Sequence, residues 1–182
     1  MITPHPALRA TFPSRGRQKK GGIGLTALEL MAACRRDNQE KARLEAQIEE
    51  LDDYITCVNA FGGAGGRASV SDRYADYMAR KDELEKRLYE TKKALAAESA
   101  AAILLTESLP DTQRKSMRGF YVYGKTGAAV ARELHYSTSS VAKALAAGRA
   151  VCSQISGEVV EDKLPPWYLK KYGEGDGKEW GD

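Results

Sequence analysis

A glycine-rich segment separates two long stretches of helical sequence, and this break limits the folds open to the chain. Residues 61–70 contain four glycines within positions 62–66, and each glycine inside a helix costs about 1 kcal/mol relative to alanine. Before the segment, apolar residues recur at spacings of four and three: Leu44, Ile48, Leu51, Ile55 and Val58. After it, a similar period continues through Tyr74, Tyr77, Met78, Leu84, Leu88 and Leu95. The pattern predicts two helices that fold back as a long antiparallel hairpin with a coiled-coil seam.

Both ends of the predicted hairpin carry local signals. Thr26, followed three positions later by Glu29, has the spacing of a capping box that begins a helix. Pro110 disfavours helix at Leu109 and suits the first turn of a new helix, so the hairpin is expected to span residues 25–108. The seam between only two helices buries little apolar surface. We therefore expect the hairpin to form a homo-oligomer. The alternative is that the apolar stripes of the two helices bury each other within a single hairpin.

The segment after this boundary has the pattern of a helix-turn-helix. Helical sequence over residues 111–123 is followed by a glycine break and resumes over residues 126–134. A tight turn at residues 135–136 precedes Ser137, a favourable N-cap for a last helix that ends near residue 155. Apolar residues fall where the two short helices would share a core: Val130, Leu134, Val141 and Leu145. The sequence thus predicts an all-α fold in which a helix-turn-helix domain, residues 109–156, follows the hairpin.

Positive charge is concentrated in two places, although the net charge is only +3. Residues 111–157 hold seven Lys or Arg against two acids, and residues 1–24 hold five against none. Double-stranded DNA is therefore the predicted partner. Candidates for reading bases are the exposed residues expected at the start of the last helix: Thr138, Ser139, Ser140 and Lys143. Candidates for phosphate contacts are Arg114, Lys115, Arg118, Lys125, Arg132 and Arg149. A helical bundle with a solvated basic face is the alternative.

The two ends of the chain lack the apolar periodicity of the middle. Residues 1–24 combine three prolines and four glycines with the basic cluster, which predicts a flexible basic arm. Residues 157–182 have an acidic balance, a proline pair and five glycines, so we predict a mostly irregular tail. Its aromatic residues Trp167, Tyr168 and Tyr172 are expected to pack locally, with anchoring on the body or on a partner as the alternative.

No pattern in the sequence points to catalysis or to a bound cofactor. His5 and His135 lack a carboxylate or cysteine at ligand spacing, and the three cysteines lack a CxxC pair, so no metal site is expected. The glycine-rich loop lacks the residue order GxxxxGK[ST] of a phosphate-binding loop. No isolated pair of acidic residues is suited to general acid–base catalysis. We expect a protein that is not an enzyme, without a signal peptide or a membrane span.

The segment from Leu109 onward resembles region 4 of sigma-70-type factors. The matching features are Leu109-Pro110, Tyr121, Gly124, the alanines of 128–131, Leu134, Ser137 and Val141. Over residues 44–155, the order of coiled-coil helix, glycine-rich loop, charged helix and helix-turn-helix is similar to phage sigma-like transcriptional regulators of the ArpU and RinA types. The resemblance implies a sequence-specific regulator of phage or prophage genes that acts with bacterial RNA polymerase in the cytoplasm of the host cell.

The chain departs from this family pattern in two respects. Sigma-like recognition helices usually carry basic residues where this chain has Ala142 and Ala144, and often also where it has Ala146 and Ala147. The resemblance therefore implies modest intrinsic affinity, and the absence of other sigma regions argues against promoter melting by this chain alone. Two other functions stay open: a phage small terminase subunit that recognises packaging-site DNA, and a coiled-coil interaction protein.

Overall fold

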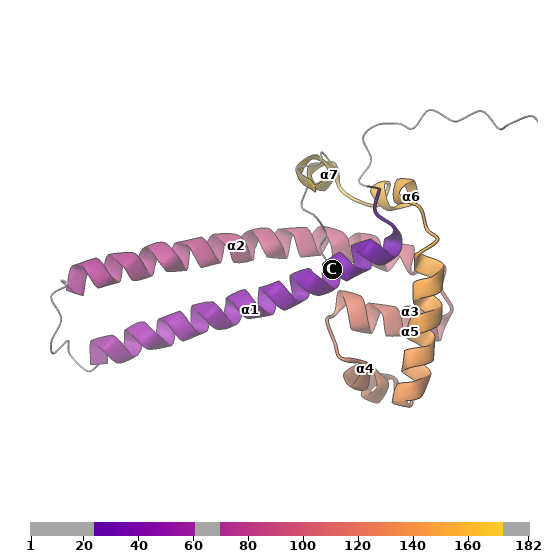
Figure 1. The fold of residues 1–182 in the computed structure, drawn as a ribbon, viewed down its shortest axis with the longest axis horizontal. Coiled ribbons are helices and arrows are strands. Elements are labelled where there is room, and N and C mark those ends of the chain that lie inside the picture. Colours follow the sequence, from indigo (N-terminus) through magenta and orange to yellow (C-terminus); the bar gives the residue numbers. More distant parts are fainter. Residues whose placement is uncertain (1–23, 61–69, 173–182) are drawn as a thin grey trace, which may run out of the picture.

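The fold is all-α, as predicted. The computed structural model describes residues 24–60 and 70–172, in which every regular element is helical (Figure 1). Three of the predicted segments lie mainly outside those residues: the basic arm up to residue 23, the glycine-rich loop over 61–69, and the end of the tail over 173–182.

A long antiparallel hairpin comes first in the fold, which confirms the prediction from the two helical repeats. Helix α1 (Ala27–Ala60) and helix α2 (Val70–Leu105) lie side by side along their length (Figure 1). The capping box at the start of α1 is also confirmed. The backbone N–H of Thr26 donates to Glu29 Oε2 at 2.6 Å, and the N–H of Glu29 donates to Thr26 Oγ1 at 3.3 Å.

Burial is uneven along the hairpin. At its root, where the chain leaves α2, side chains such as Leu30, Met31 and Ala101 are completely buried. Beyond Leu44 on α1, and before Ala94 on α2, none of the side chains that the structure describes is buried. The hairpin therefore has a packed root and a thin outer part.

A smaller helical region packs against the root. It consists of α3 (Asp111–Met117), the π-helical turn η1 (Arg118–Val122), α4 (Gly127–Leu134) and α5 (Thr138–Cys152). Helix α3 lies against α5, and η1 lies against α1 (Figure 1). The core is continuous across the predicted boundary at Pro110, because Cys34 of α1 and Met117 of α3 belong to one buried cluster.

The prediction of a mostly irregular tail is wrong for residues 157–172. These residues form two short helices, α6 (Gly157–Glu161) and α7 (Pro166–Tyr172). Val160, Leu164 and Tyr168 follow one another at spacings of four and are all buried in the shared core. Anchoring to the core therefore orders a segment whose glycines, prolines and charges suggested a loop.

The aromatic residues of the tail pack on one another and also on the body. The ring of Tyr168 lies 5.8 Å from that of Trp167 and 4.7 Å from that of Tyr172, centroid to centroid. Lys93 of α2 lies over the Trp167 ring at 4.6 Å, and Tyr168 is only 1% exposed. Local packing and anchoring on the body thus occur together.

Within residues 24–60 and 70–172, no helix is long and apolar enough to cross a membrane.

Candidate nucleic-acid interface

Helices α4 and α5 are joined by a three-residue turn with defined caps. Thr126 caps α4 by accepting from the N–H of Ala129 at 3.2 Å. His135 then adopts the left-handed conformation, with φ of 55°, and the N–H of Tyr136 donates to the carbonyl of Ala131 at 2.9 Å. Ser137 caps α5 by accepting from the N–H of Ser140 at 3.0 Å. The predicted turn and the predicted Ser137 cap are confirmed.

Close packing fixes the position of this helix pair. Val130 on α4 and Val141 on α5 are each 1% exposed. A Cβ added at Gly119 would lie 2.8 Å from Val130 Cγ2, and one added at Gly148 would lie 2.7 Å from Met117 Cγ. Both glycines therefore allow backbone approach that a side chain would prevent. Sequence reasoning did not single out either glycine, because close approach depends on contacts that are distant in the chain.

The base-reading candidates lie where the prediction expects them, on the exposed first turns of α5. Thr138, Ser139, Ser140 and Lys143 are all exposed. The hydroxyl oxygen of Ser140 lies 2.8 Å from that of Ser137, so this side chain takes part in the cap. No hydrogen bond or ion pair joins the side chains of Thr138, Ser139 or Lys143 to any other residue of the described ranges.

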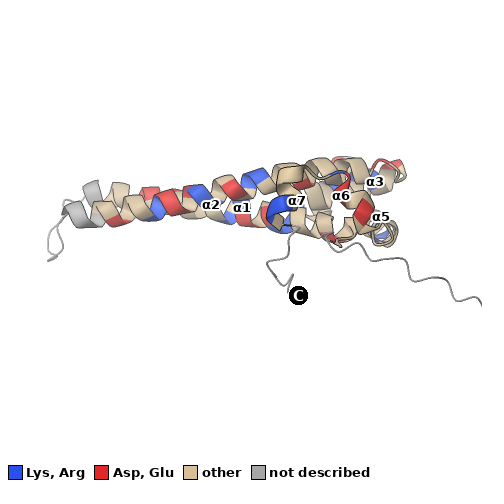
Figure 2. Ribbon diagram, turned by 90° about the horizontal axis from the view of Figure 1, so that it is seen from above, with Lys and Arg blue, Asp and Glu red and all other residues tan. Residues whose placement is uncertain are grey.

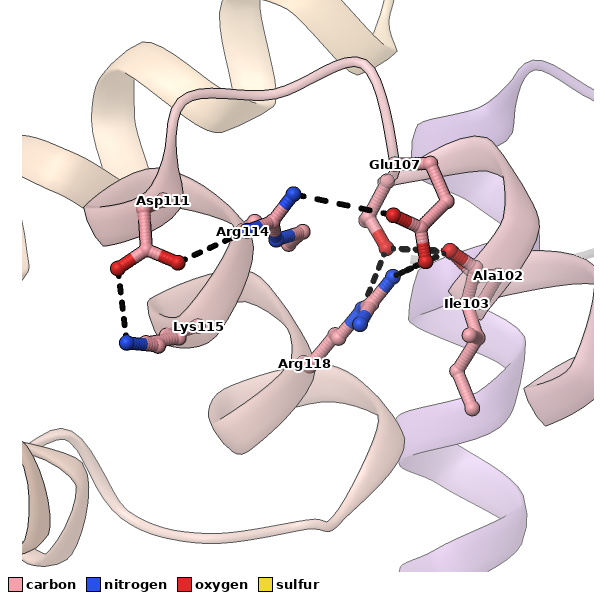
Figure 3. Close-up of polar contacts among 8 residues, drawn as sticks. Ala102, Ile103, Glu107, Asp111, Arg114, Lys115 and Arg118 are labelled. Carbon is pink, nitrogen blue, oxygen red and sulfur yellow. Dashed lines mark hydrogen bonds and ion pairs between the residues drawn. The ribbon is translucent and has the colours of Figure 1, made fainter.

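Arg118, a phosphate candidate, is instead built into the joint between α2 and α3 (Figure 3). Its Nη2 donates to Glu107 Oε1 and to the carbonyl of Ile103, both at 2.7 Å. Its Nε donates to Thr106 Oγ1 at 2.9 Å. The hydrogen bond from Arg118 is the largest cause that lowers the pKa of Glu107. A phosphate contact would have to replace these bonds, so we regard Arg118 as a structural residue.

Arg114 and Lys115 have carboxylate partners on the same joint (Figure 3). Arg114 lies 2.8 Å from Asp111 Oδ1 and 3.7 Å from Glu107 Oε2. Lys115 lies 2.8 Å from Asp111 Oδ2, and its hydrogen bond is the largest cause that lowers the pKa of Asp111. The charge count over residues 111–157 overlooked Glu107, which lies just outside that window. The net positive charge of this face is therefore smaller than the sequence suggests.

The remaining phosphate candidates differ in their partners. Lys125 Nζ lies 2.5 Å from Glu133 Oε2. Arg149 Nε donates to the hydroxyl of Tyr121 at 2.8 Å, and its guanidinium lies 5.6 Å from the Phe120 ring centroid. Arg132 is exposed. In the described part of the chain, Arg132, Lys143 and Arg149 are thus the candidate cations without a carboxylate partner.

The described residues offer no metal centre. Within residues 24–60 and 70–172, no group of three or more His, Cys, Asp or Glu could hold a metal ion. Cys34, Cys57 and Cys152 are free thiols, and burial raises the pKa of Cys34 and of Cys152. A reactive cysteine would need the opposite shift.

No protein-family model, curated protein or solved structure matches this chain. The resemblance to phage sigma-like regulators therefore stays a prediction that rests on the order of the sequence features.

Proposed function

We propose that the chain binds double-stranded DNA, with the start of α5 in the major groove. One observation carries this proposal: the α4–α5 pair exposes residues 138–140 at the start of α5 while the inner side of the helix is packed in the core. Val141 and Leu145 are 1% and 6% exposed on that inner side, and residues 138–140 are exposed on the other. A helix presented in this way from a short turn is the arrangement that helix-turn-helix proteins use to reach base edges.

The unpaired cations support the same interface. Arg132 on α4, with Lys143 and Arg149 on α5, would approach phosphates without breaking an existing ion pair. The hydroxyl of Tyr121 already orients the guanidinium of Arg149, which reduces the side-chain entropy lost on binding. Neutralised phosphates release counterions, so these residues would set affinity and its dependence on salt.

Most of the exposed side chains in the middle of α5 are small. Ala142, Ala146 and Ala150 are exposed on this helix, and alanine permits close approach and apolar contact with a thymine methyl. Few long side chains project from the helix, so direct base contacts fall mainly to Thr138, Ser139 and Lys143. We therefore propose specific but modest affinity for each copy of the chain.

The biological role that we propose is regulation of phage or prophage transcription together with bacterial RNA polymerase. The order of elements over residues 44–155 supports this role through its resemblance to phage sigma-like regulators. The geometry supports the narrower activity, DNA binding.

A salt titration on a random-sequence duplex tests the DNA-binding activity. The double variant Arg132→Ala with Lys143→Ala should bind more weakly, and the slope of log affinity against log salt should fall by about two units. Lys115→Ala is the matched control, because Lys115 is exposed but already paired with Asp111. Its slope should remain close to that of the wild type. An unchanged slope in the double variant, with its fold intact by circular dichroism, would refute the proposed interface.

A further inference from the structure

A cavity of about 360 Å³ lies where α1, α2 and α7 meet. Each of these helices supplies part of its wall, for example Asp37 on α1, Glu98 on α2 and Tyr172 on α7. Figure 2 shows α7 beside the hairpin, along which acidic and basic positions are interspersed. The volume of the cavity falls in the range of sites for small molecules, roughly 300–1,000 Å³.

The cavity has an exposed end and a buried end. Arg87 and Glu90 of α2 line it and are exposed. Ala94 and Glu98 follow about one and two turns beyond Glu90 on the same face of α2, and they are only 4% and 3% exposed. A solute that enters past Arg87 would therefore reach Glu98 last.

The carboxyl group of Glu98, at the buried end, is incompletely hydrogen-bonded. Its Oε1 accepts from the hydroxyl of Tyr168, but its Oε2 is buried and has no hydrogen-bond partner among the described residues. When the carboxyl is protonated on Oε2, this atom is a donor without an acceptor, and when it is ionised, it is an acceptor without a donor. A buried polar atom without a partner costs free energy. A donor held in the cavity would supply the missing hydrogen bond.

Acidic residues outnumber basic residues in the wall of the cavity. Among the described residues, four carboxylates and one base, Arg87, line it. Arg87 Nη2 lies 3.0 Å from Glu40 Oε1, and Lys171 Nζ of α7 lies 3.2 Å from Glu90 Oε2. These two pairs balance the charges of Glu40 and Glu90, but neither involves Glu98.

The surroundings of Glu98 disfavour its negative charge. Burial is the largest cause that raises the pKa of Glu98 to about 7, and the charge of Asp37 is the next. Arg36 lowers this pKa, but it is the smallest of the causes. A buried carboxylate of this kind is stabilised most by a cation that also donates a hydrogen bond to it.

An organic ammonium ion suits this cavity better than a metal ion. Within residues 24–60 and 70–172, no group of three or more His, Cys, Asp or Glu could hold a metal ion. An ammonium group needs only one close carboxylate, and the carbon chain that carries it can pack against Ala94 and the ring of Tyr172, which line the same cavity. We propose that the cavity binds a small aliphatic amine, whose ammonium group donates a hydrogen bond to Oε2 of Glu98.

Binding of the amine is linked to the proton of Glu98. The ammonium group pairs with the ionised carboxyl, so an amine that binds to the protonated form must displace the proton into solvent. The other titratable or charged groups that face Glu98 are Cys34, Arg36 and Asp37 on α1 and Tyr168 on α7. Burial raises the pKa of Cys34 and of Tyr168 above their ordinary values of 9.0 and 10.0, so neither titrates near neutral pH.

Calorimetric titration of the full chain with putrescine and with spermidine, in the absence of DNA, tests the site. Both amines should bind about tenfold more tightly at pH 8 than at pH 6, because the ionised fraction of a carboxyl with a pKa of about 7 rises from about one tenth to about nine tenths. 1,4-Butanediol has the carbon chain of putrescine without its charge and should not bind. Failure of both amines to bind at millimolar concentration, or equal binding of the diol, overturns the proposal.

Glu98→Gln tests the contact with the carboxyl. The variant removes a buried charge and should stay folded, while its dissociation constant for either amine should rise by about tenfold or more and lose its dependence on pH. Glu85→Gln is the matched control, because it removes the same charge from an exposed position about 160° around α2 from Arg87. It should keep the affinity and the pH dependence of the wild type. Equal affinities of Glu98→Gln and the wild type overturn the assignment of Glu98.

Thr91→Leu tests the cavity without a change of charge. Thr91 lines the cavity and is half-buried, so the larger side chain takes up part of the space that an amine would occupy. The variant, with its fold intact by circular dichroism, should bind both amines more weakly than the wild type. An unchanged affinity would show that the amines bind to carboxylates elsewhere on the surface, and it would overturn the proposal.

Discussion

The hydroxyl of Tyr168 donates a 2.5 Å hydrogen bond to Oε1 of Glu98, which joins α7 to α2 inside the core. Glu98 is 3% exposed, and its Oε2 has no hydrogen-bond partner among the described residues. Burial is the largest cause that raises the pKa of the Glu98 carboxyl to about 7, with the charge of Asp37 adding to it. Burial, followed by the charge of Glu98, also raises the pKa of Tyr168.

Stability should therefore fall as the pH rises from about 4.5 to about 7, the ordinary and the raised pKa of Glu98. The folded state holds the proton more tightly than the unfolded chain, so the contribution is complete below the lower value and lost above the upper one. Glu98→Gln removes the titration and should exceed the wild type above neutral pH by on the order of 3 kcal/mol. Urea unfolding at several pH values measures the difference.

Tyr168→Phe is the control for the pH prediction. It removes the hydrogen bond but keeps the buried carboxyl, so the variant should lose stability at every pH and retain the slope between about 4.5 and 7. Parallel curves of stability against pH for Glu98→Gln and the wild type would show that Glu98 does not titrate in this range.

Gly119 should tolerate no side chain, whereas Gly127 should. Gly119→Ala places a methyl group 2.8 Å from Val130 Cγ2, and Val130 is stiff and buried, so the variant should lose about 1–3 kcal/mol of stability. A Cβ at Gly127, in the first turn of α4, meets nothing within 4 Å. Gly127→Ala should be neutral or stabilising by up to about 1 kcal/mol. Chemical unfolding measures both, and equal losses would contradict the packing described for η1 and α4.

The turn between α4 and α5 should become more stable when glycine replaces His135. This residue has φ of 55° and ψ of 36°, a conformation that costs a residue with a Cβ roughly 1–2 kcal/mol. Glycine relieves this cost but loses more entropy on folding, so the net gain of His135→Gly is about 0.5–1 kcal/mol. His135→Ala keeps the Cβ and should show no such gain. Similar melting temperatures for the two variants would count against strain at this position.

Local signals account for the helices that sequence reasoning located correctly. The Thr26 cap depends on residues within one helical turn, and so does the Ser137 cap. Pro110 acts on its immediate neighbours, and α3 begins directly after it. Such contacts are contained in short windows of sequence, so the order of helices and the start of α5 could be predicted.

Long-range contacts explain what the sequence reasoning missed. Glu98 and Tyr168 are separated by 70 positions, so composition alone made the tail look irregular. The spacing of four between Val160, Leu164 and Tyr168 was a readable sign of helix that the glycines and prolines obscured. Counting charges in one window likewise treated Arg118 as free, although Glu107 and the end of α2 bind it.

Thr138 and Ser139 should be the residues of α5 that read DNA sequence. Thr138 and Ser139 follow the Ser137 cap on the exposed first turn of α5. Replacing both with alanine leaves the cap in place and removes two hydroxyls that have no hydrogen-bond partner among the described residues. The helix should stay folded, and the double variant should lose preference for a target selected from random duplexes by the wild type. Each good base contact is worth about 1–3 kcal/mol of discrimination.

The salt dependence distinguishes this loss from a general weakening of binding. Neither substitution removes a charge, so the slope of log affinity against log salt should match that of the wild type on both selected and random duplexes. Ser108→Ala with Ser156→Ala is the matched control, because both serines are exposed and lie outside α5. It should retain full discrimination. If the folded Thr138/Ser139 double variant also retains full discrimination, the start of α5 does not read the DNA, and the proposed interface is wrong.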